Sequence, residues 1–302
     1  MGAFMKLEKK YVVILAIFAC LLWSTAFAGV KIGFEYMPKP FTFAGMRFTL
    51  AGLILIPFAV RKNSLTQFAE NTKVILIVVF LNTAIGYALY YTAMSYVGGA
   101  TAAIIVGSGP LLTGIMTHFL MEDDKMDKYK MFSISLGLVG ILIIILHSKP
   151  LTPVGMKEVF GIILLLLNSM LTSFANIKVA QIKKGISSLF LTANQMLWGG
   201  LILLGMGRIF EGSIEFNQPV RFYIALVWLA LVSAIAFSIW FFLIQQPNVK
   251  VSELNMFKYF IPVSGAIISW ILLPNESPNL VSIIGMGFVF SALIFNHKFS
   301  NK

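Results

Sequence analysis

Two basic side chains in this 302-residue sequence fall inside long apolar stretches. Arg47 stands between PFTFAGM and a further apolar run, and Lys258 shares one helix face with Asn255 and Pro262. A charge at membrane depth costs about 2.5–3.5 kcal/mol on insertion scales, so such residues suggest a function. The planar guanidinium of Arg47 suits a substrate carboxylate. Two structural alternatives stay open: Arg47 bonds backbone carbonyls or snorkels, and Lys258 snorkels to the interface.

Aromatic and amide side chains also occur within the apolar stretches. Aromatic rings give a cavity flat apolar walls with a hydroxyl or indole N–H, although packing is the alternative. We expect Trp23, Tyr87, Tyr91 and Trp240 to face a central aqueous vestibule. Internal prolines free a backbone carbonyl and allow a kink, which suits gating. The candidate substrate-binding residues are Trp23, Arg47, Asn82, Tyr87, Tyr91, Gln195, Trp240, Asn255 and Lys258, and the candidate gating residues are Pro110 and Pro262.

Carboxylates and metal ligands are scarce in these stretches. Glu253 is the one acidic residue that the pattern places inside a span, about one helical turn deep. The three histidines are scattered without metal-ligand spacing, and Cys20 is the single cysteine. We therefore expect no metal site, cofactor, catalytic residue or disulfide. A cavity with Arg47, Lys258 and many neutral polar groups suits a zwitterion or an anion.

The composition indicates that lipid is the solvent for most of the chain. Hydrophobic residues make up 58% and charged residues 12%, and the mean hydropathy is +0.87. Soluble domains have about 45–50% apolar and about 25% charged residues. About ten stretches are long enough to cross a bilayer as helices. They lie near 11–31, 40–60, 74–96, 99–120, 129–147, 159–179, 189–210, 222–246, 250–273 and 279–296.

The basic residues predict the topology. The chain has 23 Lys and Arg against 12 Asp and Glu, and most of the basic residues lie between the apolar stretches. We interpret this excess as a positive-inside signal near lipid headgroups, not as a nucleic-acid surface. With the N-terminus inside, most of them fall on the cytoplasmic side, and both termini are expected to be cytoplasmic. The start of the chain resembles a signal peptide, but we interpret it as an uncleaved first span.

The sequence repeats itself in its second half. TAFAGVK at Thr25–Lys31 returns as TSFANIK at Thr172–Lys178, and TAIGYALYY at Thr83–Tyr91 aligns with SAIAFSIWF at Ser233–Phe241. AGLIL and GGLIL align at nearly the same offset. Two halves, 1–149 and 150–302, would each hold five spans. Because five is odd, the second half enters the membrane from the other side, which gives an inverted repeat of the kind found in secondary transporters.

These features together resemble the ten-helix EamA-type members of the drug/metabolite transporter superfamily. The residues that carry the resemblance are WSTAF with Lys31, PFTFAGMRFTLAG at Pro40–Gly52, YALYYTAMSYVGGATAAIIVGSGPLLT at Tyr87–Thr113, Glu122, and GLVGILII at Gly137–Ile144. The second half departs from this pattern, with Gln195 in the place of Arg47 and Met170 in the place of Trp23.

The resemblance implies an all-α integral membrane protein with two inverted five-helix repeats around a central cavity. Its members move amino acids or other metabolites across the cytoplasmic membrane, usually outward in bacteria. The small multidrug exporters of the superfamily use a glutamate in the first span. This chain has no carboxylate there, so we expect a zwitterion or anion in preference to a lipophilic cation.

Two other classes stay open. DDKMD at Asp123–Asp127 fits the DDxxD spacing with which polyprenyl-transferring enzymes hold magnesium on a diphosphate. Asp123, Asp124 and Asp127 would then be the metal ligands of an intramembrane enzyme. However, the second half has no matching aspartate cluster, and Lys125 and Lys128 would weaken metal binding. The third class is a membrane protein that transports nothing.

Overall fold

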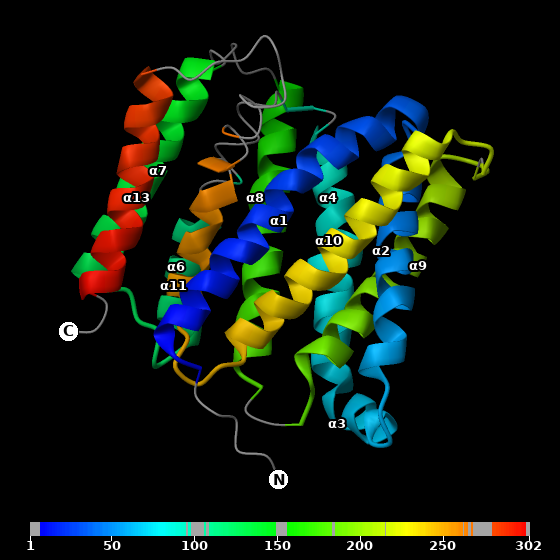
Figure 1. Ribbon diagram of the computed structural model, residues 1–302, viewed down its shortest axis with the longest axis horizontal. Coiled ribbons are helices and arrows are strands. Elements are labelled where there is room, and N and C mark those ends of the chain that lie inside the picture. Colours follow the sequence, from blue (N-terminus) through cyan, green and yellow to red (C-terminus); the bar gives the residue numbers. More distant parts are fainter. Residues whose placement is uncertain are drawn as a thin grey trace. The chain divides into compact units, whose positions relative to one another are not determined.

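The computed structural model describes residues 7–94, 96–97, 106, 109–148, 156–182, 185–214, 216–261, 263–264, 267 and 280–299, and all regular elements in these ranges are helical (Figure 1). The α-helices are α1 Lys9–Tyr36, α2 Pro40–Ala59, α3 Ser64–Ile77, α4 Ile85–Met94, α6 Gly109–Leu120, α7 Lys128–Ser148, α8 Met156–Ala180, α9 Ser188–Phe210, α10 Val220–Ile244, α11 Val251–Met256 and α13 Leu280–Phe299. A π-helix, η1 Val78–Ala84, joins α3 to α4, and a 3₁₀ turn, η2 Phe257–Tyr259, follows α11.

Among the residues that the structure describes, six helical segments are long and apolar enough to cross a membrane. They are Lys9–Ala26, Pro40–Ala59, Ser64–Met94, Val159–Ala180, Ser188–Phe210 and Val220–Ile244. Each coincides with a predicted span, which confirms the all-helical membrane class. Helices α7 and α13 occupy two further predicted spans. The spans expected near 99–120 and 250–273 fall partly outside the described residues.

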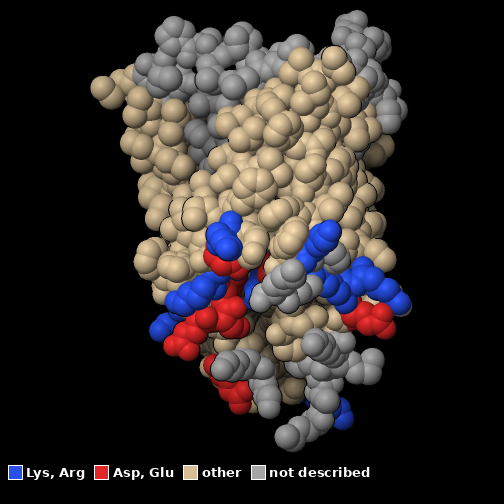
Figure 2. Space-filling model, turned by 90° about the vertical axis from the view of Figure 1, so that its left-hand side faces the viewer, with Lys and Arg blue, Asp and Glu red and all other residues tan. Residues whose placement is uncertain are grey.

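The charged side chains have the distribution that a membrane protein needs. On the face drawn in Figure 2 they gather toward the lower end, and the tan surface above them, up to the grey atoms, shows no Lys, Arg, Asp or Glu. Exposed charges in the loop between α6 and α7 include Glu122, Asp123, Lys125 and Asp127, and the exposed Lys128 begins α7. An uncharged helical surface suits the hydrocarbon layer, because helices satisfy their own backbone hydrogen bonds there.

The chain divides into two compact units that cut across the sequence repeat. One unit contains Met1–Tyr91 with Lys178–Asn248, and the other contains Thr92–Ile177 with Val249–Lys302. Each unit therefore takes helices from both halves of the sequence. We call them the first unit and the second unit.

In the first unit, α2 and α9 pack against each other through glycines. A Cβ atom added to Gly52 would lie 2.5 Å from the Leu197 backbone nitrogen, and one added to Gly200 would lie 2.3 Å from the Thr49 nitrogen. Residues later in α2 contact residues earlier in α9, so the two helices are antiparallel. The repeat alignment pairs Gly52 with Gly200 and Leu197 with Thr49. The two contacts are thus counterparts, as an inverted repeat requires.

Both ends of this helix pair are tied by side chains. Glu211, just after α9, accepts hydrogen bonds of 2.8 Å from the backbone N–H groups of Phe41 and Thr42 and from the Thr42 hydroxyl. This carboxylate satisfies free donors at the N-terminus of α2 and complements its dipole. At the other end, the Gln67 side-chain oxygen accepts from the Ser187 backbone N–H, 3.1 Å away, at the start of α9.

The glycine contact predicts a large difference between two single substitutions on α9. Gly200→Ala forces a Cβ against the backbone of α2, whereas a Cβ on Gly205 meets nothing within 4 Å. Overpacking costs about 1–3 kcal/mol, and removing glycine from a helix gains up to about 1 kcal/mol. We expect Gly200→Ala to lower the thermal unfolding temperature in detergent and Gly205→Ala to leave it equal or higher. Equal melting of the two variants would contradict the close contact.

In the second unit, α7 packs against α13 and α11 packs near α6 and α7. A Cβ on Gly140 would lie 2.5 Å from the Gly285 carbonyl oxygen. Near the other end of α7, the Phe132 and Phe295 rings have centroids 4.9 Å apart. The Tyr259 hydroxyl donates to the Ile134 carbonyl at 3.0 Å and fixes η2 on α7.

Candidate functional site

Arg47 is held in the first unit by neutral groups. Its side chain on α2 is 4% exposed, and its Nε donates to Ser233 Oγ on α10 at 2.8 Å. Ser233 Oγ in turn donates to the Leu229 carbonyl at 2.8 Å. The Tyr91 side chain on α4 lies beside the Arg47 guanidinium. No carboxylate in the described part of the chain forms an ion pair with Arg47.

Aromatic rings from α1, α2 and α4 surround this charge. Tyr87 lies 4.4 Å from Phe48 and 6.1 Å from Tyr91, measured between ring centroids. Tyr90 lies 5.6 Å from Tyr91, and Phe34 of α1 lies 5.7 Å from it. The tyrosines follow one another at helical spacing on α4. Their hydroxyls therefore give Arg47 a polar, uncharged surrounding.

Trp23 and Trp240 form a second aromatic contact in the first unit. Their ring centroids are 5.1 Å apart, and Phe237 lies 5.2 Å from Trp23. Trp240 is 1% exposed and Trp23 is half-buried. This contact joins α1 to α10. The two tryptophans, predicted to line a vestibule, pack against each other within this unit.

Gln195 and Asn82 are also buried in the first unit. Gln195 lies on α9 with no exposed surface, and within the described ranges neither atom of its amide group has a hydrogen-bond partner. Asn82 is 6% exposed and lies in the π-helix η1 next to Thr83. The Thr83 hydroxyl is likewise buried and has no partner in those ranges. π-Helical turns in α-helices occur frequently at functional sites.

The remaining candidates belong to the second unit. Asn255 is 2% exposed and donates back to the Val251 carbonyl at 2.9 Å. Lys258 is half-buried in η2, and Pro110 is the second residue of α6 and is buried. Pro262 lies outside the described residues. The structure thus brings Arg47, Tyr87 and Tyr91 together in one unit and places Asn255 and Lys258 in the other.

The span expected near 250–273 is not one continuous α-helix. Helix α11 ends at Met256, and a 3₁₀ turn follows over Phe257–Tyr259. Pro262 has no N–H to donate to the Lys258 carbonyl, and its ring would clash with that carbonyl in an α-helix. Side chains at i and i+3 also lie on one side of a 3₁₀ turn, so the common face of Asn255 and Lys258 stays a prediction.

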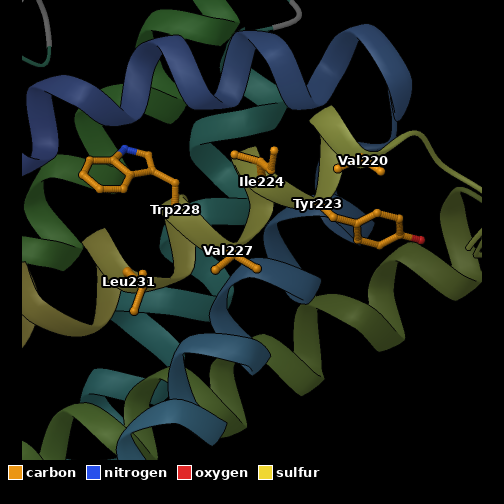
Figure 3. A pocket seen from close by; sticks show the side chains of 6 residues that line it. All are labelled: Val220, Tyr223, Ile224, Val227, Trp228 and Leu231. Carbon is orange, nitrogen blue, oxygen red and sulfur yellow. The ribbon is translucent and has the colours of Figure 1, made fainter.

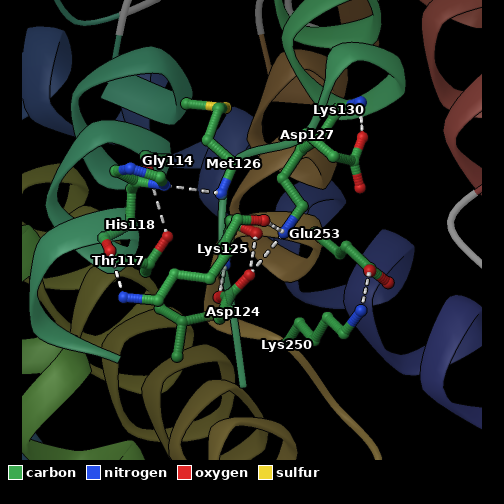
Figure 4. A network of polar contacts seen from close by, with 12 residues as sticks. Gly114, Thr117, His118, Asp124, Lys125, Met126, Asp127, Lys130, Lys250 and Glu253 are labelled. Carbon is green, nitrogen blue, oxygen red and sulfur yellow. Dashed lines mark hydrogen bonds and ion pairs between the residues drawn. The ribbon is translucent and has the colours of Figure 1, made fainter. Parts of the chain in front are cut away.

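The aspartates of the DDxxD pattern have three separate environments, and Figure 4 shows those of Asp124 and Asp127. Asp124 is fully buried, accepts from Lys130 Nζ at 2.6 Å, and accepts from the Ser252 backbone N–H at 2.8 Å. Asp127 accepts from the Lys130 backbone N–H at the start of α7, 2.8 Å away. Asp123 is exposed.

These partners explain the aspartates without a metal. Asp124 ties the loop after α6 to the N-terminus of α11, and Asp127 caps α7. No group of three His, Cys, Asp or Glu side chains placed to hold a metal ion occurs in the ranges that the structure covers. The interpretation of Asp123, Asp124 and Asp127 as one magnesium site has no geometric support there.

An apolar groove runs along one face of α10 (Figure 3). Its lining consists of Val220, Tyr223, Ile224, Val227, Trp228 and Leu231. The Trp228 indole N–H donates to the Thr25 hydroxyl of α1 at 3.2 Å, and the Tyr223 hydroxyl donates to the Phe216 carbonyl. The groove carries no charge, so its chemistry suits a lipid chain and not a zwitterion.

Sequence reasoning missed Ser233 and Tyr90 as neighbours of Arg47. Ser233 lies far along the sequence from Arg47 and is one of many serines, so its type gave no signal. The repeat did contain a clue, because Ser233 aligns with Thr83, which was already in a polar segment. Tyr90 was visible in the YALYY pattern, but its place beside Arg47 depends on the packing of α4 against α2.

Known proteins resemble this chain over nearly its full length. The uncharacterized transporter YoaV of Bacillus subtilis (strain 168) is 25% identical over 280 residues, covering 91% of this chain and 93% of YoaV. The uncharacterized inner membrane transporter YedA of Escherichia coli (strain K12) is 25% identical, covering 92% and 88%. One crystal structure of a protein aligns with a TM-score of 0.78 at 16% identity, covering 95% of this chain and 96% of that one, which shows the fold.

The family comparison agrees with the internal repeat. The model of the EamA-like transporter family matches the chain twice, over residues 10–146 and 159–297. The buried arginine, the apolar helices and the antiparallel contact of α2 with its counterpart α9 are consistent with a two-repeat membrane fold. The chain is a multi-pass membrane protein and belongs to the EamA-like transporter family.

Proposed function

We propose that this transporter carries amino acids or related small zwitterionic or anionic metabolites outward across the cytoplasmic membrane by alternating access. The observation that supports this substrate class is the environment of Arg47. Its charge is buried against the hydroxyls of Ser233 and Tyr91. A guanidinium has five donors in a planar fork, so donors are left for a carboxylate.

The other candidates have supporting roles in this proposal. Trp23, Tyr87, Tyr91 and Trp240 would form the walls of the substrate path, and Asn82 and Gln195 would offer neutral hydrogen bonds. Asn255 and Lys258 would offer further polar contacts to the substrate, and Pro110 and Pro262 would permit helix bending. The same proposal places the boundary between the two five-helix repeats at residues 149 and 150.

Flux across proteoliposomes tests the proposed function. Purified protein is reconstituted, and uptake of labelled amino acids, nucleosides and sugar derivatives is compared with that of empty vesicles. We expect amino acids or similar acids to cross and to be recovered chemically unchanged by mass spectrometry. Flux restricted to lipophilic cations, or recovery of a modified product, would contradict the proposal.

The topology part of the proposal predicts that both termini are cytoplasmic. Ten spans return the chain to its starting side, and the basic residues favour the same orientation. Reporter fusions placed after Lys302 and at Gly98–Gly99 should therefore report opposite sides of the membrane. If both fusions report one side, the arrangement of five spans plus five spans is wrong.

A further inference from the structure

Two polar pairs in the first unit are counterparts under the sequence repeat. In the alignment of the two halves, Gln195 of α9 stands where Arg47 stands in α2, and Thr83 of η1 stands where Ser233 stands in α10. Arg47 and Ser233 are hydrogen-bonded at 2.8 Å. Gln195 and Thr83 have no hydrogen bond from their side chains within the described ranges. One pair is thus closed and its counterpart is open.

The open pair lies within reach of closure. Gly199 stands one helical turn after Gln195, and a Cβ on Gly199 would lie 2.6 Å from the Thr83 Cβ. Side chains four apart on a helix have Cβ atoms about 5–6 Å apart. A glutamine side chain together with a hydrogen bond covers that distance, so a rotamer change or a small helix rotation would bring the Gln195 amide to the Thr83 hydroxyl.

The backbones of the two counterpart segments differ in the same place. Thr83 lies in the π-helix Val78–Ala84, whereas Ser233 lies in the regular α-helix Val220–Ile244. A π-turn holds one more residue than the α-turn it replaces, so it rotates the side chains that follow. The pair that includes Thr83 of the π-helix is open, and the pair that includes Ser233 of the regular α-helix is closed.

The open pair is costly in the state that the structure shows. Gln195 and Thr83 are both fully buried, and a buried polar group without a partner is strongly unfavourable. When a transporter with an inverted repeat is open to one side of the membrane, its two halves have different conformations. If the halves exchange these conformations, the transporter opens to the other side. In that second state, Gln195 and Thr83 would be hydrogen-bonded to each other.

We infer that the two pairs form a conformational switch that closes alternately. In the state described here Arg47 binds Ser233, and Gln195 and Thr83 are apart. In the opposite state η1 becomes α-helical and Gln195 binds Thr83, while α10 takes up a π-turn and Ser233 leaves Arg47. The released Nε of Arg47 is then available to an anion. This inference rests on the proposed transport by alternating access. It states that Arg47, Ser233, Gln195 and Thr83 determine which of the two states is favoured.

Substitutions in the two pairs should shift the equilibrium between states in opposite directions. The assay uses the Cys20→Ser background with nitroxide labels at Leu65→Cys and Val220→Cys, which are 87% and 74% exposed and both belong to the first unit. Pulsed electron–electron double resonance measures the distance between the two labels. Without added substrate, it gives the ratio of the two states as two populations of this distance. Ser233→Ala should lower the population of the described state about tenfold or more, because a hydrogen bond to a charged group is lost. Thr83→Val should raise that population about twofold to tenfold.

Three further variants keep the test decisive. The double variant Ser233→Ala/Thr83→Val should return toward the original ratio, and Thr83→Ser, which keeps the hydroxyl, should preserve it. Ser238→Ala on α10, outside both pairs, is the matched control and should not shift the ratio. Shifts of equal sign, or no shift in any variant, would overturn the switch. Opposite shifts without solute flux would instead overturn the proposed function alone.

Discussion

Replacing Asp124 by asparagine is expected to destabilise the protein strongly. Asp124 and Lys130 are 0% and 3% exposed, and their charged atoms are 2.6 Å apart. Breaking a buried ion pair by neutralising one partner costs about 3–5 kcal/mol, because the other charge stays buried without compensation. The asparagine side chain could still accept a hydrogen bond from the Ser252 backbone N–H. The loss of stability would therefore come mainly from the unpaired charge of Lys130. Chemical or thermal unfolding in detergent micelles measures it.

The neighbouring residue provides the control for this prediction. Asp123→Asn changes the same charge in the same loop, but Asp123 is exposed, and its effect should stay within about 0.5 kcal/mol. The double variant Asp124→Asn/Lys130→Met removes both charges and should recover part of the loss. Similar stabilities for Asp123→Asn and Asp124→Asn would show that the buried ion pair does not hold the loop to α11.

Arg47→Gln is expected to weaken the transport of carboxylate substrates about tenfold to a hundredfold. A hydrogen bond to a charged group contributes about 1.5–3 kcal/mol, and glutamine retains much of the size and a donor but not the charge. Arg47→Lys should recover only part of the affinity, since an ammonium cannot offer the planar fork. Concentration-dependent uptake into proteoliposomes gives the apparent affinity of each variant.

Arg61→Gln is the matched control, because Arg61 follows α2 and is exposed. It removes the same charge from the same region of the chain and should leave the affinity unchanged. Arg47→Gln must also reach the membrane and purify as well-folded protein, as judged by its unfolding temperature. If well-folded Arg47→Gln transports acids with the affinity of the original protein, Arg47 has a structural role only.

Most of the helices could be predicted from hydropathy, since a bilayer-spanning helix needs a long apolar run. The sequence could not show where regular helix breaks down. The π-helix at Val78–Ala84 and the 3₁₀ turn at Phe257–Tyr259 lie inside stretches that hydropathy predicts as continuous spans. Nor could it show the compact units, because the close contact of Gly52 and Gly200 with the facing helix depends on packing between the two halves.

Arg47 could be identified because a charge in an apolar run is conspicuous, but its partners could not. Ser233 and Tyr91 have ordinary residue types, and only the packing of α2, α4 and α10 brings them to the guanidinium. Asp124 illustrates the opposite difficulty. Its DDxxD pattern matches a metal site by spacing, whereas its burial beside Lys130 and Ser252 gives it a structural role.

The measurement that tests the central claim most directly is a cycle between Arg47 and the substrate's carboxylate. Counterflow in proteoliposomes is measured for a transported amino acid and for its amide, each with the original protein and with Arg47→Gln. The account predicts that the original protein prefers the acid about tenfold to a hundredfold and that Arg47→Gln treats the two compounds nearly alike. An equal preference for the acid in both proteins would contradict the claim that Arg47 binds the carboxylate.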